Sequence, residues 1–305
     1  MRQRDRTRVS RGSSLGGGLA PYAFVAPSFF FLLAFGILPI LVAGVVSLTN
    51  LDISGLANSD NIAFVGFDNY RKLLTDGDFW RSLRITGLFI IVGVPTIITI
   101  SLTLALGLNM SSSPMFRAMR TFYFLPAITA IVAISLIWGF MYNSQFGLFN
   151  FLLTSVGLPA VNWLSDPLMA KVSVGVVAVW RATGLNIIVF LAALQSIPRE
   201  YYEAADIDGA DGWATFRWIT LPLLRFALLF VTVTTLIAWL QFFDEPFVLT
   251  DGGPAGATTS VSLFIYQEGF RFNRFGYASA GTVILFLIIV VVTAFQLRLY
   301  RSNDA

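Results

Sequence analysis

The chain has 305 residues, of which 56% are hydrophobic and 12% charged, and its formal net charge is +3. This composition is far more apolar than that of an ordinary soluble domain, and it predicts a membrane protein. The sequence contains no Cys and no His. That excludes thiol nucleophiles, the usual zinc ligands and a Ser-His-Asp triad, so we expect neither a metal site nor catalytic residues.

Nucleotide chemistry is not expected within this chain. Its two lysines, Lys72 and Lys171, follow no Gly-x4-Gly run, which excludes a phosphate-binding loop of the G-x-x-x-x-G-K-[ST] type. Most basic residues flank apolar segments instead of forming one patch, which argues against nucleic-acid binding. We therefore expect a protein that is not an enzyme and holds no cofactor of its own.

Six apolar windows reach the roughly 20 residues that a helix needs to cross the hydrocarbon core. The first is too long for a signal peptide and five more follow, so we interpret it as a retained span. The expected organisation is a basic flexible tail over 1–21, a six-span domain over 22–298 and a short tail over 299–305. The predicted spans cover residues 22–48, 82–108, 122–142, 172–194, 223–243 and 277–297.

Positive charges predict the orientation of these spans. Twelve arginines lie in the two tails, in the connection between spans two and three, and in the loop between spans four and five, whereas the opposite connections hold seven Lys and Arg residues. By the positive-inside rule, both termini and the loop between spans four and five are predicted to be cytoplasmic.

That loop, residues 196–222, is acidic. Pro198 predicts the start of a helix, Gly209 a left-handed helix end, and Pro222 the close of a second helical piece. Small and aromatic side chains together indicate a docking surface, whereas a helix pair resting on the headgroups is disfavoured because the cytoplasmic leaflet is negative. The loop carries five carboxylates within twelve positions: Glu200, Glu203, Asp206, Asp208 and Asp211.

The spacing within the loop resembles a known signature. Glu203-Ala204-Ala205, three residues, Gly209, nine residues, Ile219, one residue and Leu221-Pro222 follow the EAA pattern E-A-A-x3-G-x9-I-x-L-P. This pattern is found in the permease subunits of bacterial ABC importers that work with a substrate-binding protein. The segment "DEPFVLTDGGPAGATT" over 244–259 is similar to the carbohydrate branch related to the maltose-importer permeases.

The resemblance implies an all-α membrane protein with six transmembrane helices, the type I ABC importer permease fold and a cytoplasmic coupling helix. It implies a multi-pass subunit of the bacterial cell membrane that forms half of a heterodimer with a second permease. Two cytoplasmic ATPase subunits would bind ATP and Mg, and an extracytoplasmic sugar-binding protein would deliver the sugar.

The resemblance also implies roles for the loop residues. Glu203 would make the charged contact to the ATPase, Ala204 and Ala205 would let the coupling helix sit deep, and Gly209 would allow the bend. The roles of the additional carboxylates Asp206, Asp208 and Asp211 stay open.

Arg181 is the only charged residue deep inside a predicted span. Its placement there costs about 2.5–3.5 kcal/mol on insertion scales, so it is expected to face protein or water. It either contacts the solute or locks helices together, and the predicted spans place no Asp or Glu at its depth. The other candidates for the solute pathway are Asn186, Trp239, Gln241 and Asp244, with interfacial anchoring as the alternative for Trp239.

The outer connections are expected to receive the binding protein, with Gly252, Gly253 and Pro254 shaping the nearest loop. Three alternatives stay open. An ion-coupled secondary transporter would need intramembrane carboxylates and inverted repeats, neither of which the sequence indicates. An integral membrane enzyme would need a catalytic set, and a sequence without His or Cys offers little to build one from. An importer permease for another solute, such as a glycerol phosphate, a polyamine or a peptide, would carry the same coupling signature.

Overall fold

The computed structural model describes residues 20–111 and 113–302. Within these ranges the chain is helical, and its only extended pairing is an isolated bridge between Thr49 and Phe64. The basic tail predicted before residue 22 lies outside the described residues as far as residue 19, as do residues 303–305 of the second tail. The all-α fold class predicted from the sequence is confirmed over the part described.

Four membrane spans are continuous or nearly so. The first runs through Phe24–Val46 and contains a π-helical turn, and the other three are single helices of 28 to 33 residues. Each is apolar enough to cross a membrane. Their elements are α1 (Ala20–Leu32), η1 (Leu33–Ile37) and α2 (Leu38–Val46) for the first span, then α5 (Gly77–Asn109), α9 (Pro167–Gln195) and α15 (Phe275–Ser302).

The predicted third span is not one straight helix. It is a pair, α6 (Pro114–Ile128) and α7 (Ile131–Met141), whose axes differ by 98°. Pro126 lacks the N–H that would bond to the carbonyl of Phe122, which weakens the last turn of α6. Thr129 and Ala130 then adopt extended backbone angles, so the helix ends and a new one starts in another direction.

The fifth span is also broken. α11 (Gly212–Thr215), η3 (Phe216–Thr220) and α12 (Leu221–Leu223) form one arm, and α13 (Arg225–Leu240) forms the other at 65° to it. Leu224, at the bend, has ψ near 0°. With each bent pair counted as one span, the described residues contain six spans, as predicted, although two of the predicted boundaries are wrong by eight residues or more.

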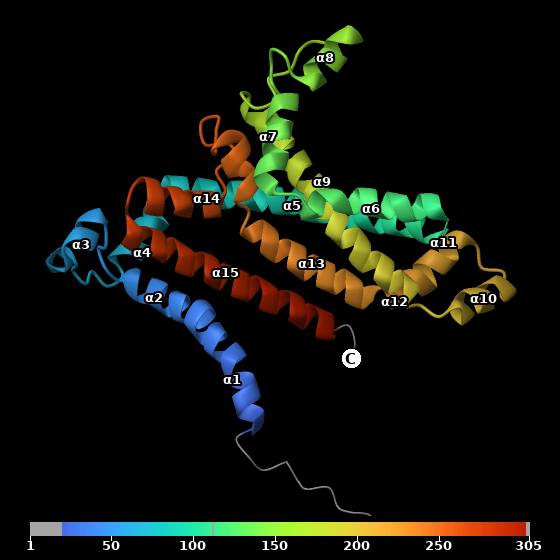
Figure 1. Cartoon of the computed structure of the whole chain (residues 1–305), viewed down its shortest axis with the longest axis horizontal. Helices are drawn as coiled ribbons and strands as arrows, with labels where there is room; N and C mark the ends of the chain where they lie inside the picture. Colours follow the sequence, from blue (N-terminus) through green and yellow to red (C-terminus); the bar gives the residue numbers. More distant parts are fainter. Residues whose placement is uncertain (1–19, 112, 303–305) are drawn as a thin grey trace, which may run out of the picture.

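The core lies between α5 and α9, which run side by side through the centre of the bundle in Figure 1, with α6 packed on α9 and α13 packed on α5. Two apolar clusters hold them together. One, near the middle of α5, contains Phe89, Val174 and Trp239; the other, towards its C-terminal end, contains Leu108, Phe190 and Val231.

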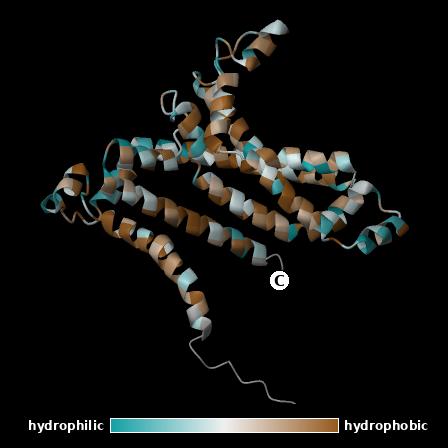
Figure 2. Cartoon of the chain, in the orientation of Figure 1, coloured by the Kyte–Doolittle hydropathy of each residue, from teal (hydrophilic) through white to brown (hydrophobic). Residues whose placement is uncertain are grey.

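The first span is attached to the rest of the chain mainly at its C-terminal end. There Asn69 of α4 (Asp68–Thr75) donates two hydrogen bonds through Nδ2, to the carbonyls of Ser47 and Thr49 at 2.9 and 2.7 Å. None of Phe24–Val46 is buried by the rest of the chain, and Figure 2 shows this helix as an apolar rod that leaves the bundle. Short elements α3 (Ile53–Ala57) and η2 (Ser59–Asn61) precede α4.

An arm formed by α7 and α8 (Leu148–Ser155) projects from the bundle (Figure 1). Asn150 pins it: its Nδ2 donates to the carbonyls of Ser144 and Val161, and its Oδ1 accepts from the Val161 N–H and from Trp163 Nε1, all at 2.9–3.0 Å. Around this pin, the rings of Trp138, Tyr142, Phe149 and Trp163 pack in a cluster. Tyr142, which suits an interfacial anchor by sequence, is buried there instead.

Candidate coupling loop and solute pathway

The acidic loop forms two short helices at one end of the bundle, as expected. α9 ends at Gln195, and α10 (Arg199–Ile207) begins directly after Pro198. α11 follows after a turn of four residues. In Figure 1, α10 and α11 extend beyond the ends of α9 and α6, so this loop is the outermost part of that end of the molecule.

Gly209 ends α10 in the left-handed conformation, with φ +76°. The N–H of Ala210 bonds to the carbonyl of Ala205, and that of Gly209 bonds to the carbonyl of Asp206, at 2.9 and 3.2 Å. These two bonds form a Schellman motif, which satisfies carbonyls that the helix leaves unpaired. A side chain at residue 209 would be strained in this conformation.

Asp211 has a structural role that its sequence position did not reveal. Its side chain accepts a hydrogen bond of 2.7 Å from the N–H of Ala214 and so caps the N-terminus of α11. Asp206 and Asp208, by contrast, are exposed and belong to the last turn of α10 and its C-cap. The three additional carboxylates therefore do not form one functional group.

The signature residues divide between an outer and an inner face. Glu203 and Ala204 are exposed, whereas Ala205 is buried. Ile219 and Leu221 are half-buried, and Pro222 is exposed next to the bend. Tyr202 and Thr220, whose hydroxyl groups lie 3.3 Å apart, tie α10 to η3.

Three large apolar side chains on the same loop are left uncovered by the chain. Ile207, Trp213 and Trp218 are 86%, 69% and 73% exposed. Trp218 fits the aromatic docking surface predicted for this loop, whereas Ile207 and Trp213 were not singled out from the sequence. Exposed aromatic and aliphatic groups beside a charged residue are typical of a protein-docking surface.

Arg181, the candidate for the solute pathway, has a carboxylate partner. Its Nε donates to Oε1 of Glu245 at 2.7 Å, and the Glu245 side chain is only 1% exposed. The expectation that no acidic residue shares the depth of Arg181 is therefore wrong. The predicted fifth span was extended to residue 243, whereas α13 ends at Leu240, and the chain then turns so that η4 (Pro246–Thr250) packs beside α9.

Trp239 does not line a pathway. Its ring is 4% exposed, stacks on Phe242 with a centroid distance of 5.1 Å, and lies against Gly93 of α5. It is a core residue, which corrects both the expectation of a sugar platform and the alternative of an interfacial anchor. A tryptophan side chain suits a protein core, a membrane interface or a sugar site equally well by sequence. The close approach of α5 is what places this one in the core.

The remaining pathway candidates make no hydrogen bond or ion pair with Arg181 in the described part of the chain. Asn186 is buried, and its Nδ2 donates to the carbonyl of Ala182 and, at 3.4 Å, to Oγ1 of Thr235, so it joins α9 to α13. Gln241 and Asp244 are exposed at the turn after α13. In the described part of the chain, no side-chain hydrogen bond joins any two of the five residues named from the sequence, although Asp244 adjoins Glu245, the partner of Arg181.

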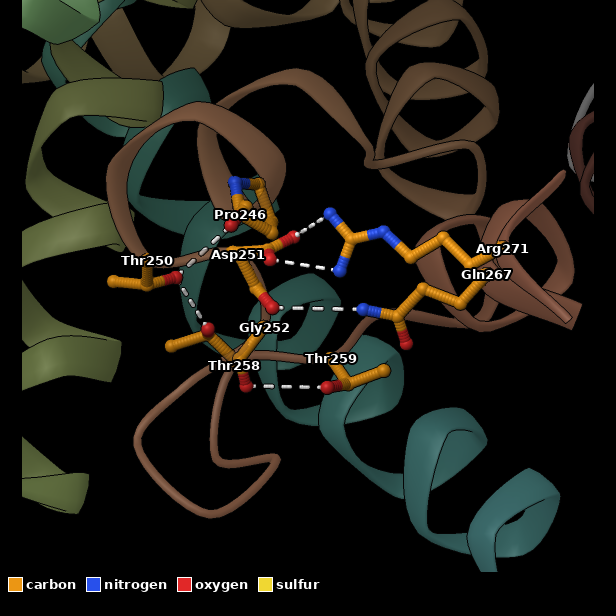
Figure 3. A network of polar contacts seen from close by, with 8 residues as sticks. All are labelled: Pro246, Thr250, Asp251, Gly252, Thr258, Thr259, Gln267 and Arg271. Atoms are coloured by element: carbon orange, nitrogen blue, oxygen red, sulfur yellow. Dashed lines mark hydrogen bonds and ion pairs between the residues drawn. The ribbon is translucent and has the colours of Figure 1, made fainter.

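The glycine-rich loop after η4 is rigidly braced, as Figure 3 shows. Asp251 forms a two-pronged ion pair with Arg271 at 2.6 and 2.7 Å, and Thr259 Oγ1 donates to the carbonyl of Gly252. Gly252 is buried, with φ +84°, and a Cβ there would lie 2.5 Å from Thr259 Oγ1. The loop leads through α14 (Val261–Tyr266) and η5 (Gln267–Arg271) to α15.

Of the three residues expected to shape a docking loop, Pro254 lines a cavity. This cavity, of about 410 Å³, opens at the end of the bundle opposite α10 and is lined by the cationic residues Arg81, Arg84 and Lys171. Gly252 and Gly253 instead shape the loop from within, where the carbonyl of each accepts a hydrogen bond from a threonine hydroxyl. A second cavity of about 550 Å³ lies at the same end, between α4 and the start of α15.

Comparisons with known proteins agree with this architecture. Residues 11–304 match the family model described as "Binding-protein-dependent transport system inner membrane component". The chain belongs to this family. It is thus a transport component of a membrane and crosses that membrane several times, and the family resemblance inferred from the EAA signature is confirmed.

Individual relatives support the same assignment. The chain is 36% identical to the lactose transport system permease protein LacF of Rhizobium radiobacter, over 98% of both chains. It is 34% identical to the trehalose/maltose transport system permease protein MalF of Thermococcus litoralis, over 92% of this chain and 93% of the relative. A chain of a bacterial alginate ABC transporter crystal structure superposes with a TM-score of 0.80 at 24% identity, covering 95% of this chain and 98% of that one, which shows the same fold.

Proposed function

We propose that this chain is the transmembrane subunit of an ATP-driven sugar importer and forms half of its translocation pathway. The relatives named above transport lactose and trehalose or maltose, and they match nearly the whole chain. The observation that carries the mechanism is the exposed surface of the α10–α11 loop, which includes Glu203, Ala204 and three uncovered apolar side chains.

The partners follow from this proposal. Two cytoplasmic ATPase subunits bind ATP and Mg, because this chain has no sequence for a phosphate-binding loop. A second permease subunit forms the other half of the pathway, and an extracytoplasmic sugar-binding protein docks at the end opposite α10. The cationic cavity beside Pro254 supports that location, because basic side chains steer an acidic partner surface.

Orientation is part of the proposal. With both termini and the coupling loop in the cytoplasm, the connection between spans two and three, which holds Arg117 and Arg120, also lies on the cytoplasmic side. The positive-inside rule favours this orientation. The ATPases then meet α10, and the binding protein meets the loops around Asp251 and Arg274.

The mechanism is rigid-body alternation. Closure of the two ATPase subunits on ATP draws the two docked loops of a permease pair together, and the spans reorient from inward to outward opening. α9 and α13 receive this motion first because they border the loop on its two sides. The Schellman turn at Gly209 keeps α10 at a fixed angle to α11, so that the loop moves as one body.

Reconstitution tests the proposal. The chain is co-expressed with its partner subunits, purified and placed in proteoliposomes with the binding protein, and uptake and ATP hydrolysis are measured with lactose, maltose and trehalose. We expect one of these sugars to be taken up and to stimulate hydrolysis. The Glu203→Lys variant is expected to reduce both activities at least tenfold, because it places a cation in the docking contact.

Glu200→Lys is the matched control, since Glu200 is exposed on the same helix but outside the signature. It should leave uptake within about twofold of wild type. An assembly that forms without any ATPase, or a Glu203→Lys variant as active as the control, would contradict the proposed coupling.

A further inference from the structure

The ion pair between Arg181 and Glu245 leaves hydrogen-bonding capacity unused. A guanidinium has five N–H donors, and among the described residues only the Nε–H of Arg181 has an acceptor. Glu245 Oε2 is buried and has no hydrogen-bond donor in the described part of the chain. A buried carboxylate oxygen without a partner is costly, so a donor from outside this chain is expected beside it.

The position of Arg181 limits what that outside group is. Arg181 lies 14 residues into α9, which corresponds to about 21 Å along the helix axis. Its side chain is 32% exposed, and on the same helix face Leu185 and Ile188 are also left uncovered by the chain. A guanidinium at membrane depth avoids lipid, so this face of α9 meets protein or a water-filled path.

Glu245 fixes both the direction and the charge of the guanidinium. Because the Glu245 side chain is only 1% exposed, its 2.7 Å bond to Nε restrains the guanidinium and leaves the two Nη groups without an acceptor in the described part of the chain. The carboxylate also cancels the positive charge, so the pair carries no net charge. An unpaired arginine would attract phosphorylated or other anionic solutes, whereas a neutralised one offers directed donors without that attraction.

We propose that Arg181 contacts the solute in the translocation pathway and that Glu245 is the positioning residue that makes this contact selective for uncharged, polyhydroxylated sugars. The inference rests on the proposed function as a sugar importer. In the sugar-bound state, the Nη groups donate to sugar hydroxyls. Removal of the Glu245 charge leaves a net cation at the same place, and selectivity shifts towards anionic sugars.

The first experiment replaces the charged acid by its amide. Equilibrium binding of radiolabelled lactose and of radiolabelled glucose 1-phosphate is measured on the purified complex in the wild type and in Glu245→Gln. We expect the ratio of glucose 1-phosphate to lactose binding to rise at least tenfold in the variant. A ratio that changes less than twofold in an assembled complex would overturn the inference, since a purely structural pair has no reason to discriminate by solute charge.

A second experiment separates solute contact from folding. Arg181→Met with Glu245→Met removes both charges at similar volume, and such replacements of buried pairs are often tolerated. We expect this double variant to assemble, but to take up sugar at least tenfold more slowly. Uptake within twofold of wild type would overturn the inference.

The control is Glu268→Met with Arg274→Met, an ion pair of the same kind at 3.2 Å outside the spans. If this control assembles while both Glu245 variants fail to assemble, the pair serves folding and the inference is wrong. A wild-type complex that takes up neither lactose, maltose nor trehalose contradicts the proposed function itself, and the inference with it. An active wild type with an equally active double variant contradicts the inference alone.

Discussion

The indole ring of Trp239 occupies the space in which Gly93 would otherwise carry a side chain. A Cβ built on Gly93 would lie 2.2 Å from two carbon atoms of that ring. The pair fixes how closely α13 approaches α5 in the central cluster with Phe89 and Val174. This contact explains why a tryptophan that suits a sugar pathway by sequence is a core residue in the fold.

Gly93→Ala is expected to destabilise the protein by about 1–3 kcal/mol, the usual effect of overpacking a filled core. Gly87→Ala is the control on the same helix, because a Cβ there meets nothing within 4 Å. The melting temperature of the detergent-solubilised complex measures both. Equal melting temperatures for the two variants would show that the Trp239 ring moves aside at no cost.

Asp211→Ala is expected to weaken the start of α11 by about 1 kcal/mol, since it removes an N-cap. Asp208→Ala removes an exposed carboxylate that makes no side-chain hydrogen bond in the described part of the chain, and it should have little effect. Hydrogen exchange at the amides of residues 212–215 distinguishes the two. Faster exchange in Asp208→Ala than in Asp211→Ala would refute the assignment.

Asn150→Ala is expected to loosen the arm of α7 and α8, because among the described residues Asn150 is the one whose side-chain hydrogen bonds join residue 144 to residues 161 and 163. Two carbonyls and two N–H donors lose their partner, and each such loss costs about 1–3 kcal/mol when water does not replace it. Protease cleavage within 144–163 reports the opening. Asn162→Ala, which removes an exposed amide twelve residues away, is the control and should leave cleavage at the wild-type rate.

Glu268 predicts a dependence of stability on pH. Burial raises the pKa of its carboxyl above the ordinary value of 4.5, and the nearby Arg274 guanidinium opposes the rise. The folded protein therefore binds this proton more tightly than the unfolded chain does. The stabilisation is fully present below pH 4.5 and is lost as the pH rises through the folded value.

The comparison with Glu268→Gln, whose amide does not titrate, isolates this effect. The melting temperature of wild type minus that of the variant should fall as the pH is raised from about 4.5 towards neutrality. A difference that rises over the same interval would mean that the Arg274 contact outweighs burial.

The sequence predicted the features that depend on run length and local chemistry. Six apolar runs predicted six spans, and the Pro198, Gly209 and Pro222 pattern predicted two short helices with a left-handed turn between them. It did not predict the partner of Arg181, because hydropathy locates where an apolar run ends but not where the chain goes next. After Leu240 the chain turns towards α9, and that return brings Glu245 to Arg181.

The position of Glu245 also bears on the alternative of an ion-coupled secondary transporter. An ion-coupled transporter needs intramembrane carboxylates, and the predicted spans hold none, yet Glu245 is buried beside Arg181. The match to the binding-protein-dependent transport family, not the absence of carboxylates, argues against an ion-coupled secondary transporter. Trp239 was misjudged for a related reason: an aromatic side chain has the same sequence signature in a core, at an interface and in a binding site.

Because of the bend at Leu224, α9 and α13 are expected to respond differently to a force applied at the loop between them. α9 is unbroken from Pro167 to Gln195, so a push on its C-terminal end is transmitted along the helix axis. The arm that leads into α13 includes η3 and meets α13 at 65°. The same push therefore acts as a torque about the bend at Leu224. Under the proposed function, closure of the ATPase subunits would therefore shift α9 along its axis and rotate α13 about Leu224.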